Sequence, residues 1–452
     1  MRRLFYFVEE KAVLSMLIYA PHTGSRMKYI AEILLTNICG VDISFAKSSL
    51  EFESYQGPKI NYSLQPTGPY EYWVSPQGLL SENGIVQQHI DVFNWNGYKA
   101  FFRSKQGDFP FDIFSASFYL LSRYEEYLPH SKDEYGRFSH RHSLAFREGF
   151  LQQPLINYWM EGFKLELKRK FPDLLMRSSK FNFIPTYDID MAYSYLYKGF
   201  VRNAGGLVKS LFKGRLSDMR DRIDVLMKKK DDPYDAYEWL YALHLKHNLH
   251  PYYFFLMAKE QRGYDKNISP TRDEMQELIR YHALGYQVGI HPSWQSGDDP
   301  SLLREEVELL EYITDRKITN SRQHFIRFTL PDSFRQIRKA GIMKEFSMGY
   351  GSINGFRASI AQPFLWYDLA KEEITDLEIY PFCFMDANAF YEQRQTPRAA
   401  FEELKYYHDT VKKVNGTLIT IWHNNFFGTD PAYIGWREVY ELFLREVVYW
   451  DI

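Results

Sequence analysis

Ionisable side chains stand at the ends of apolar, strand-like segments in the second half of this 452-residue sequence. They are Asp188 and Asp190 after FNFIPTY, His291 after YQVGI, Arg322 and His324 at the start of SRQHFIRF, Asp386 after LEIYPFCFM, and His423 after TLITIW, where the polar but non-ionisable Asn424 follows it. Burying a carboxylate or an imidazole without a partner is costly, so we expect these groups to meet one another or a metal ion. Carboxylate and imidazole ligands without thiolate suit Zn²⁺ or a similar divalent ion. The pattern predicts a metal together with an acid–base pair.

The segments that must position these groups alternate between strand and helix from residue 181 onward. The strand-like runs after the first are HPYYFFLM, YQVGIH, QHFIRF, LEIYPFCFM and TLITIWH. Between them, SPTRDEMQELIRYHALG and TPRAAFEELKYYHDTVKKVNG begin with Ser-Pro or Thr-Pro and end in or beside glycine, as helices do. This alternation predicts parallel strands with helical crossovers. The C-terminal ends of such strands form one reactive face.

The motifs at these strand ends resemble those of a known family. The series TYDID, GIHPSWQS, SRQH, PFCFMD and IWHNN, in this order within about residues 181–430, resembles the polysaccharide deacetylase family. These are metal-dependent NodB-homology esterases that remove N- or O-acetyl groups from glycans. The sequence is most similar to the longer bacterial members with an extra N-terminal α/β domain. The resemblance implies a distorted parallel (β/α) barrel over residues 181–452, preceded by an N-terminal α/β domain with a helical connector over residues 1–175.

The resemblance also implies a role for each residue that matches a family motif. Asp188 would be the general base and Asp190 a metal ligand. His291 would be a second ligand, and Arg322 would orient the catalytic aspartate. In the last motif His423 would be the acid, and Asp386 stands where the family has an aspartate that pairs with this histidine.

Two positions depart from the family pattern. Ile189 separates two aspartates that are usually adjacent, although residues two apart on a strand share a face. Gln295 stands where the second motif normally has a second metal-binding histidine. We expect His324 to supply the missing ligand, with Ser293, Gln295 or Asp298, acting through water, as alternatives. The expected cofactor is a divalent metal ion, with zinc as the first choice.

Further residues are expected to contact the substrate. Aromatic residues make up 17% of the chain, and surplus rings often line grooves where the apolar faces of sugars stack. Trp294, Trp422 and Asn424 lie in the motifs themselves. Arg357 lies in the glycine-bounded loop GFRASIAQPF and is a candidate to contact a glycan or a carboxylate.

These expectations lead to a hydrolase that acts on carbon–nitrogen bonds other than peptide bonds and removes acetyl groups from an acetylated glycan or glycan precursor. One alternative is a non-catalytic glycan-binding protein on a degenerate barrel, which the Gln295 position would permit. A second alternative is a small-molecule amide hydrolase on the same fold.

Composition excludes several other classes. The net charge of −2 gives no long-range attraction to nucleic acid or to an anionic membrane. No run of about 18 apolar residues occurs, so no transmembrane helix is expected. Glu9, Glu10 and Lys11 interrupt the first apolar run, which argues against a signal peptide. With only two cysteines, Cys39 and Cys383, a cytoplasmic location is expected.

One basic, amphipathic segment interrupts the strand–helix alternation. Residues 208–232, VKSLFKGRLSDMRDRIDVLMKKKDD, could contact an anionic partner or a membrane surface. Aspartates are interleaved with the basic residues, which favours an ordinary solvated helix.

Overall fold

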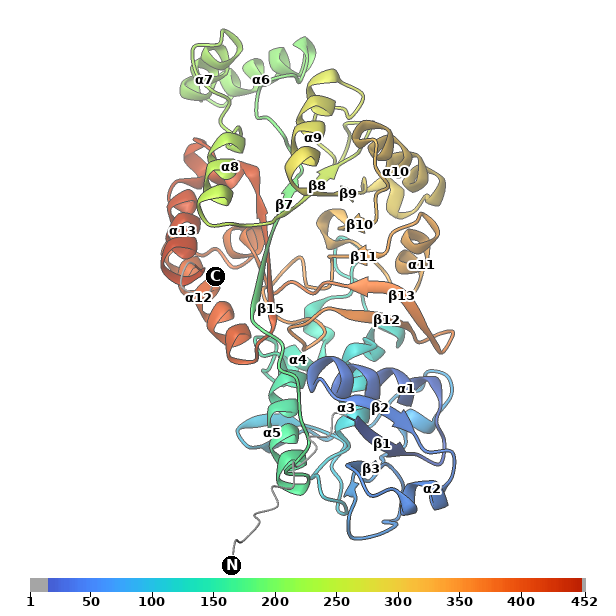
Figure 1. Ribbon diagram of the computed structural model, residues 1–452. Helices are drawn as coiled ribbons and strands as arrows, with labels where there is room; N and C mark the ends of the chain where they lie inside the picture. Colours follow the sequence, from blue (N-terminus) through green and yellow to red (C-terminus); the bar gives the residue numbers. More distant parts are fainter. Residues whose placement is uncertain (1–14, 449–452) are drawn as a thin grey trace, which may run out of the picture.

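Two separate parallel sheets organise the chain in the computed structural model, which describes residues 15–448 (Figure 1). The N-terminal sheet has four strands in the order β2-β1-β3-β4. These are β1 (Ser15–Tyr19), β2 (Asp42–Phe45), β3 (Lys59–Asn61) and β4 (Tyr72–Trp73). A separate antiparallel pair, β5 (Phe93–Trp95) and β6 (Tyr98–Ala100), follows. The expected N-terminal α/β arrangement is confirmed.

Five α-helices accompany this sheet in the part of the chain from residue 15 to 181. They are α1 (Ser25–Ala31), α2 (Ser49–Ser54), α3 (Ile113–Leu121), α4 (Leu144–Arg147) and α5 (Leu155–Lys170). Helix α3 ends at Leu121, and two residues later Arg123 adopts a left-handed backbone (φ 54°). That turn lets the Arg123 side chain bind Glu125 and Glu126 inside the protein.

The second sheet has nine strands in the order β12-β13-β11-β10-β9-β8-β7-β15-β14. All neighbours are parallel except β12 and β13. The strands are β7 (Asn182–Ile189), β8 (Tyr252–Leu256), β9 (Gln287–His291), β10 (Asn320–Ser321), β11 (Lys344–Glu345), β12 (Phe364–Asp368), β13 (Glu373–Ile379), β14 (Phe384–Met385) and β15 (Thr417–His423). The expected parallel sheet with helical crossovers is confirmed.

The connection between β13 and β14 shows that this sheet curls. The two strands lie near opposite ends of the strand order, with six strands between them, yet only residues 380–383 join them. Seven strand spacings in a flat sheet would cover about 34 Å. The connecting chain can reach only about 18 Å. The sheet therefore bends toward a barrel, although among residues 15–448 no hydrogen-bonded pairing joins β12 to β14.

Helices surround the second sheet (Figure 1). In that view α9, α10 and α11 lie on one side, and α12 and α13 lie on the other. The helices are α6 (Phe200–Phe212), α7 (Leu216–Leu226), α8 (Tyr237–Lys246), α9 (Asp273–Gly285), α10 (Pro300–Thr314), α11 (Asp332–Lys339), α12 (Pro397–Lys413) and α13 (Trp436–Phe443). Among the described residues, no helix has the length and apolar character needed to cross a membrane.

Two expected strands differ from the structure. QHFIRF is not a strand: β10 ends at Ser321, and His324–Ile326 form a short turn in which Phe325 and Ile326 have positive φ. LEIYPFCFM is not one strand but the end of β13, a crossing connection and β14. Both differences arise because the apolar residues pack inside a curled sheet rather than along one straight strand.

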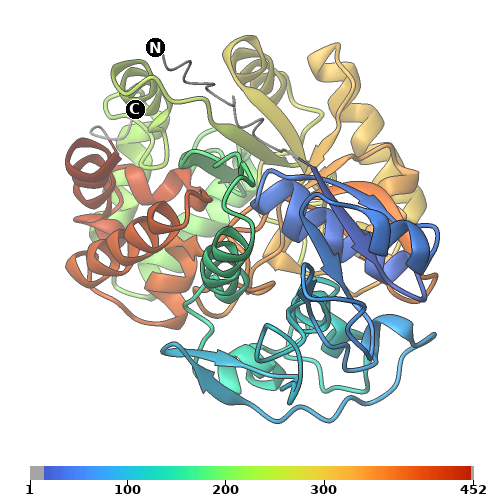
Figure 2. The ribbon, with the colours of Figure 1, turned by 60° about the horizontal axis from the view of Figure 1, so that its bottom comes forward.

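The N-terminal part packs directly on the second sheet, and one apolar core runs through both. In Figure 2 helix α5, in green, lies between the blue and cyan N-terminal segments and the red helices. Buried polar contacts join the two parts. Arg26 Nε donates to Glu372 (2.9 Å), and Tyr29 donates to the Leu365 carbonyl (2.8 Å). The expected division near residues 175–181 falls in the connection between α5 and β7.

Candidate metal and acid–base site

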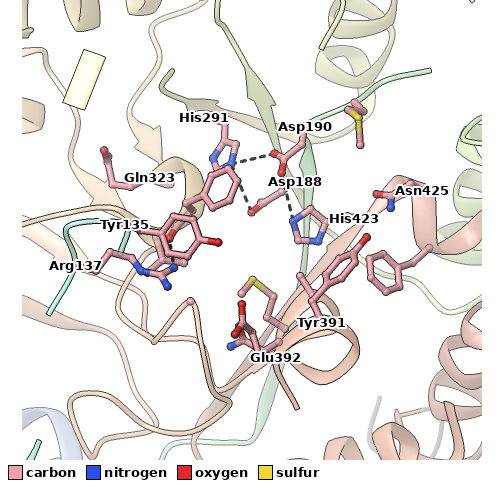
Figure 3. Close-up of a pocket in the computed structure, with 18 residues that line it drawn as sticks. Tyr135, Arg137, Asp188, Asp190, His291, Gln323, Tyr391, Glu392, His423 and Asn425 are labelled. Atoms are coloured by element: carbon pink, nitrogen blue, oxygen red, sulfur yellow. Dashed lines mark hydrogen bonds and ion pairs between the residues drawn. The ribbon is translucent and has the colours of Figure 1, made fainter. Parts of the chain in front are cut away.

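A pocket of about 360 Å³ opens at the C-terminal ends of β7, β9 and β15 (Figure 3). Asp188, Asp190, His291 and His423 line it. Its volume is within the range of small-molecule sites, about 300–1,000 Å³. The structure therefore brings four of the residues expected at the site into one cavity.

The alternation of β7 explains how two carboxylates reach the pocket. Asp188 and Asp190 both face the pocket, and Thr186 accepts a hydrogen bond from the same arginine as Asp188 does. Tyr187 points to the other face, where its hydroxyl lies 2.7 Å from His244 Nε2. The expectation that Ile189 leaves both aspartates on one face is confirmed, because strand side chains alternate.

Asp190, His291 and His324 form a group that could hold a metal ion, with ligand atoms within 4.8 Å of one another. His291 Nε2 lies 3.1 Å from Asp190 Oδ1, and His324 Nε2 lies 3.5 Å from Asp190 Oδ2. Ligand atoms of a tetrahedral ion with bonds of about 2.0–2.1 Å lie about 3.3–3.4 Å apart. The spacing of the three side chains therefore fits one small divalent ion.

The second nitrogen of each histidine is already held. His291 Nδ1 donates to the Arg322 carbonyl oxygen at 2.5 Å, and His324 Nδ1 donates to Asp265 Oδ1 at 2.9 Å. Both neutral rings would then present the lone pair of Nε2 to the carboxylate of Asp190. Two lone pairs cannot face a carboxylate favourably unless a cation, either protons or a metal ion, lies among them.

Electrostatics at the triad show the same need for positive charge. Burial opposes charging of His324, but Asp190 and Asp265 outweigh it and raise the pKa of this imidazole to about 9. Burial also opposes ionisation of Asp190, yet His324 and His291 hold the pKa of its carboxyl well below its usual value. Asp190 Oδ1 is buried and accepts no hydrogen bond. The donor set and this unsatisfied oxygen fit a bound divalent cation.

Asp188 is held by a buried arginine. Arg322 Nη1 donates to Asp188 Oδ1 at 2.9 Å and to Thr186 Oγ1 at 2.6 Å. The Arg322 side chain is fully buried, and its Nε donates to the Phe346 carbonyl at 3.1 Å. These bonds fix both the guanidinium and the carboxylate. Asp188 Oδ2 lies 4.0 Å from His291 Nε2, beside the triad.

His423 is held by Asp386 across the ends of β15 and β14. His423 Nδ1 donates to Asp386 Oδ1 at 2.6 Å, and its backbone N–H donates to Asp386 Oδ2 at 2.7 Å. The other ring nitrogen, Nε2, lies 3.6 Å from Asp190 Oδ2. Burial lowers the pKa of His423, but Asp386 and Asp190 outweigh it and raise this pKa to about 10. His423 therefore lines the pocket with a ring that favours its protonated form.

Four residues expected to contact substrate do not line this pocket. Arg357 is buried in an ion pair with Glu126 (2.6 Å), which joins the two parts of the chain. Trp422 is fully buried against Tyr440. Trp294 stacks on Tyr264, with ring centroids 4.2 Å apart. Asn424 is buried and donates to the carbonyls of the segments after β7, including Met191 (3.1 Å), and its neighbour Asn425 lines the pocket instead.

The three residues expected as alternatives to His324 as third ligand bind other residues or lie outside the triad. Asp298 binds Arg327 with a shortest distance of 2.6 Å. The Ser293 hydroxyl accepts a hydrogen bond from the Ser296 backbone (3.2 Å). Gln295 is outside the group that could hold a metal ion.

Sequence reasoning missed Asp265 and one whole wall of the pocket. Asp265 lies in the loop after β8. The segment HPYYFFLM, which predicted this strand, has no ionisable group at its C-terminal end, and this gap could have directed attention to the loop that follows. The missed wall comes from the N-terminal part of the chain: Tyr135 and Arg137 line the pocket. Their sequence, DEYGRF, carries no signal of this contact.

Hydrogen bonds and ring contacts hold this wall against the turn after β10. The ring of Tyr135 stacks on Phe325 with centroids 5.4 Å apart, and Arg137 Nη1 donates to the Phe325 carbonyl at 2.7 Å. Arg137 Nε also binds Asp133 at 2.8 Å. Figure 3 shows Tyr135 and Arg137 facing the pocket from the side opposite His423.

The fold and the site together define an α/β protein with a mainly parallel sheet, in which a triad that could hold a metal ion lies beside a carboxylate held by Arg322 and an imidazole held by Asp386. Residues 16–172 match the model of a family of unknown function, DUF7033. No curated protein sequence matches the chain at a significant level.

Several solved structures are similar to this chain, including the following two. One is a "putative polysaccharide deacetylase" from Mycobacterium smegmatis, with 14% identity and a TM-score of 0.37, covering 60% of this chain and 84% of the other. The second is a "probable polysaccharide deacetylase" from Pseudomonas aeruginosa PAO1, with 12% identity and a TM-score of 0.36, covering 59% and 83%.

Proposed function

We propose that this protein is a metal-dependent hydrolase that removes acetyl groups from an acetylated glycan or glycan precursor, cleaving a carbon–nitrogen bond other than a peptide bond. The observation that carries the proposal is the meeting of two supported proton-transfer groups in one pocket. Asp188, held by Arg322, and His423, held by Asp386, both lie beside Asp190. A hydrolase needs one group that accepts a proton and one that donates it.

Asp190, His291 and His324 would hold the ion, and Zn²⁺ is the ion we propose. When bound, such an ion supplies Lewis acidity toward an acyl carbonyl and toward water. Asp188 is placed to accept the proton of an attacking water, because Arg322 binds its other oxygen and keeps it oriented. His423 directs Nε2 into the pocket and is placed to donate a proton to the leaving nitrogen.

We propose a glycan as the substrate because of the side chains that line the pocket and because of the sequence motifs. Tyr135, Phe325, Tyr391 and Phe426 bring aromatic side chains to the pocket. Such rings stack on the apolar faces of sugars. We propose a cytoplasmic location, in keeping with Cys39 and Cys383, which are both free and buried.

The test combines metal analysis with a deacetylation assay on the full chain. Purified protein should contain close to one divalent ion per chain and should release acetate from acetylated chitooligosaccharides or peptidoglycan. Asp188→Asn should lower this rate by about 10²–10⁴-fold while metal content stays unchanged. Equal activity in Asp188→Asn would remove Asp188 from the mechanism.

Two other results would replace the proposal. Protein that binds the same oligosaccharides but holds no metal and releases no acetate would be a glycan-binding protein. Protein that holds metal and hydrolyses only small acetamides would be a small-molecule amide hydrolase.

A further inference from the structure

The helical hairpin α6–α7 presents its apolar side chains to solvent and its polar side chains to the protein. In α6 the apolar residues recur at helical spacing on one side, and Phe200, Val201 and Phe212 are 87%, 82% and 87% exposed. Val208 and Leu211 on the same side are also more than half exposed. The buried residues of α6 are Asn203 and Ser210. A helix that packs on a water-soluble protein normally has the opposite orientation.

The polar interior of the hairpin holds it in this orientation. Arg222 of α7 reaches between the helices, where Nη1 donates to Asn203 Oδ1 at 2.8 Å. Gly206 leaves room for it, because a Cβ there would lie 2.6 Å from the guanidinium. Asn203 in turn donates to the Tyr195 carbonyl at 3.1 Å, and the Arg222 guanidinium lies 4.4 Å from the centre of the Tyr195 ring. These contacts hold the polar side of the hairpin inward and therefore its apolar face outward.

Hydrogen bonds also anchor the base of the hairpin to the body of the protein. Asp232 accepts hydrogen bonds from three consecutive backbone N–H groups, those of Ser194, Tyr195 and Leu196, at 2.7–2.9 Å. Arg202 donates to two carbonyls of the loop after β8, at 3.1 Å each. Figure 1 shows α6 and α7 projecting at the end of the molecule far from the N-terminal sheet.

The hairpin is positively charged, in contrast to the chain as a whole. Residues 198–230 contain ten Lys and Arg but only three Asp, a net charge of +7, whereas the whole chain has a net charge of −2. Exposed cations lie on the same hairpin: Lys209 and Lys213 are next in the chain to Val208 and Phe212, and Lys228 and Lys229 follow α7. Exposed apolar side chains bordered by Lys and Arg are the composition of helices that lie in the interface of an anionic bilayer.

We propose that the α6–α7 hairpin docks the protein on an anionic phospholipid surface, with Phe200 and Phe212 inserted at the level of the headgroups. The hairpin follows Asp190 in the chain and leaves the sheet at the edge that carries the pocket. Docking would therefore hold the pocket close to the lipid surface. This inference is independent of the reaction performed in the pocket.

Vesicle sedimentation with the full chain tests this docking. Vesicles of phosphatidylcholine alone are compared with vesicles that contain about one-third phosphatidylglycerol. We expect binding to the anionic vesicles only, and weaker binding at high salt, because salt screens the Lys and Arg charges. Phe200→Ser with Phe212→Ser should lower the bound fraction roughly tenfold or more. Lys228→Glu with Lys229→Glu should do the same, since each charge near the surface contributes to binding.

Matched controls and a position-specific probe complete the test. Leu284→Ser on α9 and Tyr312→Ser on α10 remove side chains that are 82% and 76% exposed outside the hairpin, and should bind as wild type does. Because both native cysteines are buried, a polarity-sensitive thiol dye on Phe212→Cys reports on this position alone. Its emission should shift to the blue with anionic vesicles.

Three results would overturn the proposal. Wild-type protein could fail to bind vesicles of either composition. The hairpin variants could bind as tightly as wild type while circular dichroism shows them folded. Light scattering could show a wild-type dimer that Phe200→Ser with Phe212→Ser converts to monomer, which would make the hairpin an interface between two copies of this chain.

Discussion

His324 Nδ1 lies 2.9 Å from Asp265 Oδ1, and this contact directs His324 Nε2 toward Asp190. Asp265 is fully buried and also accepts a hydrogen bond from the backbone N–H of Trp294, with a shorter distance of 3.1 Å. The carboxylate therefore fixes the ring orientation of His324, which we propose as the third metal ligand. A carboxylate behind a ligating histidine is the usual support of such a ligand.

Asp265→Asn should weaken metal binding about 10–100-fold, because the amide supports the His324 ring less well than the carboxylate does. Titration of the metal-free protein with Zn²⁺, followed by calorimetry, measures this change. Gln295→Ala is the matched control and should bind Zn²⁺ as wild type does, because Gln295 lies outside the triad. Loss of binding in the Gln295 variant, with none in the Asp265 variant, would assign the third ligand to Gln295.

Asp386→Asn should lower the deacetylation rate about 10²–10⁴-fold without loss of metal. Three donors converge on this carboxylate: His423 Nδ1, the His423 backbone N–H and the Ala387 backbone N–H (2.6 Å). An amide has only one oxygen, so its NH₂ group would face a donor and the ring would lose its position. Steady-state kinetics with metal analysis checks this. Unchanged kinetics would mean that His423 does not act through Asp386.

Tyr135→Ala should raise KM for acetylated oligosaccharides about tenfold while kcat changes little. Tyr135 lines the pocket but lies on the N-terminal part of the chain, on the side of the pocket opposite His423. Tyr70→Ala removes an 81% exposed ring of the N-terminal part that does not line this pocket, and should leave both constants unchanged. A large fall in kcat with constant KM would show that Tyr135 acts on the reacting atoms rather than on binding.

Glu306→Gln should stabilise the protein at pH 8 but not at pH 4. Burial raises the pKa of Glu306 from 4.5 to about 7, and its Oε1 has no hydrogen-bond partner. As pH rises above 4.5 the unfolded chain loses this proton first, so the free energy of unfolding falls until the pH reaches about 7. The free energy of unfolding of the wild type falls by about 3 kcal/mol in all over this pH range, and Glu306→Gln removes this fall.

Urea unfolding at several pH values measures this difference. Glu308→Gln changes an exposed glutamate of the same helix and should show no such pH dependence. A constant difference between Glu306→Gln and wild type from pH 4 to pH 8 would contradict the raised pKa.

Local sequence determined which groups stand at strand ends and which face of β7 they share. The period of two in FNFIPTYDID is a property of any strand, so Asp188 and Asp190 could be placed together without a structure. The strand–helix alternation likewise determined the parallel sheet, because parallel neighbours need long crossovers. The proposal of His324 as a metal ligand rests on the family resemblance, in which Gln295 takes the place of a histidine.

Only the tertiary structure decided what surrounds these groups. QHFIRF has the apolar composition of a strand, yet His324 lies in a turn, where its ring contacts Asp265, 59 residues earlier. The glycine-bounded loop around Arg357 predicted a substrate contact. In the structure Arg357 is buried and binds Glu126, 231 residues away. Tyr135 reaches the pocket from the N-terminal part, and the apolar face of α6 points outward because Arg222 occupies the inner side. Each of these outcomes depends on contacts between distant residues, which the local period of a sequence does not encode.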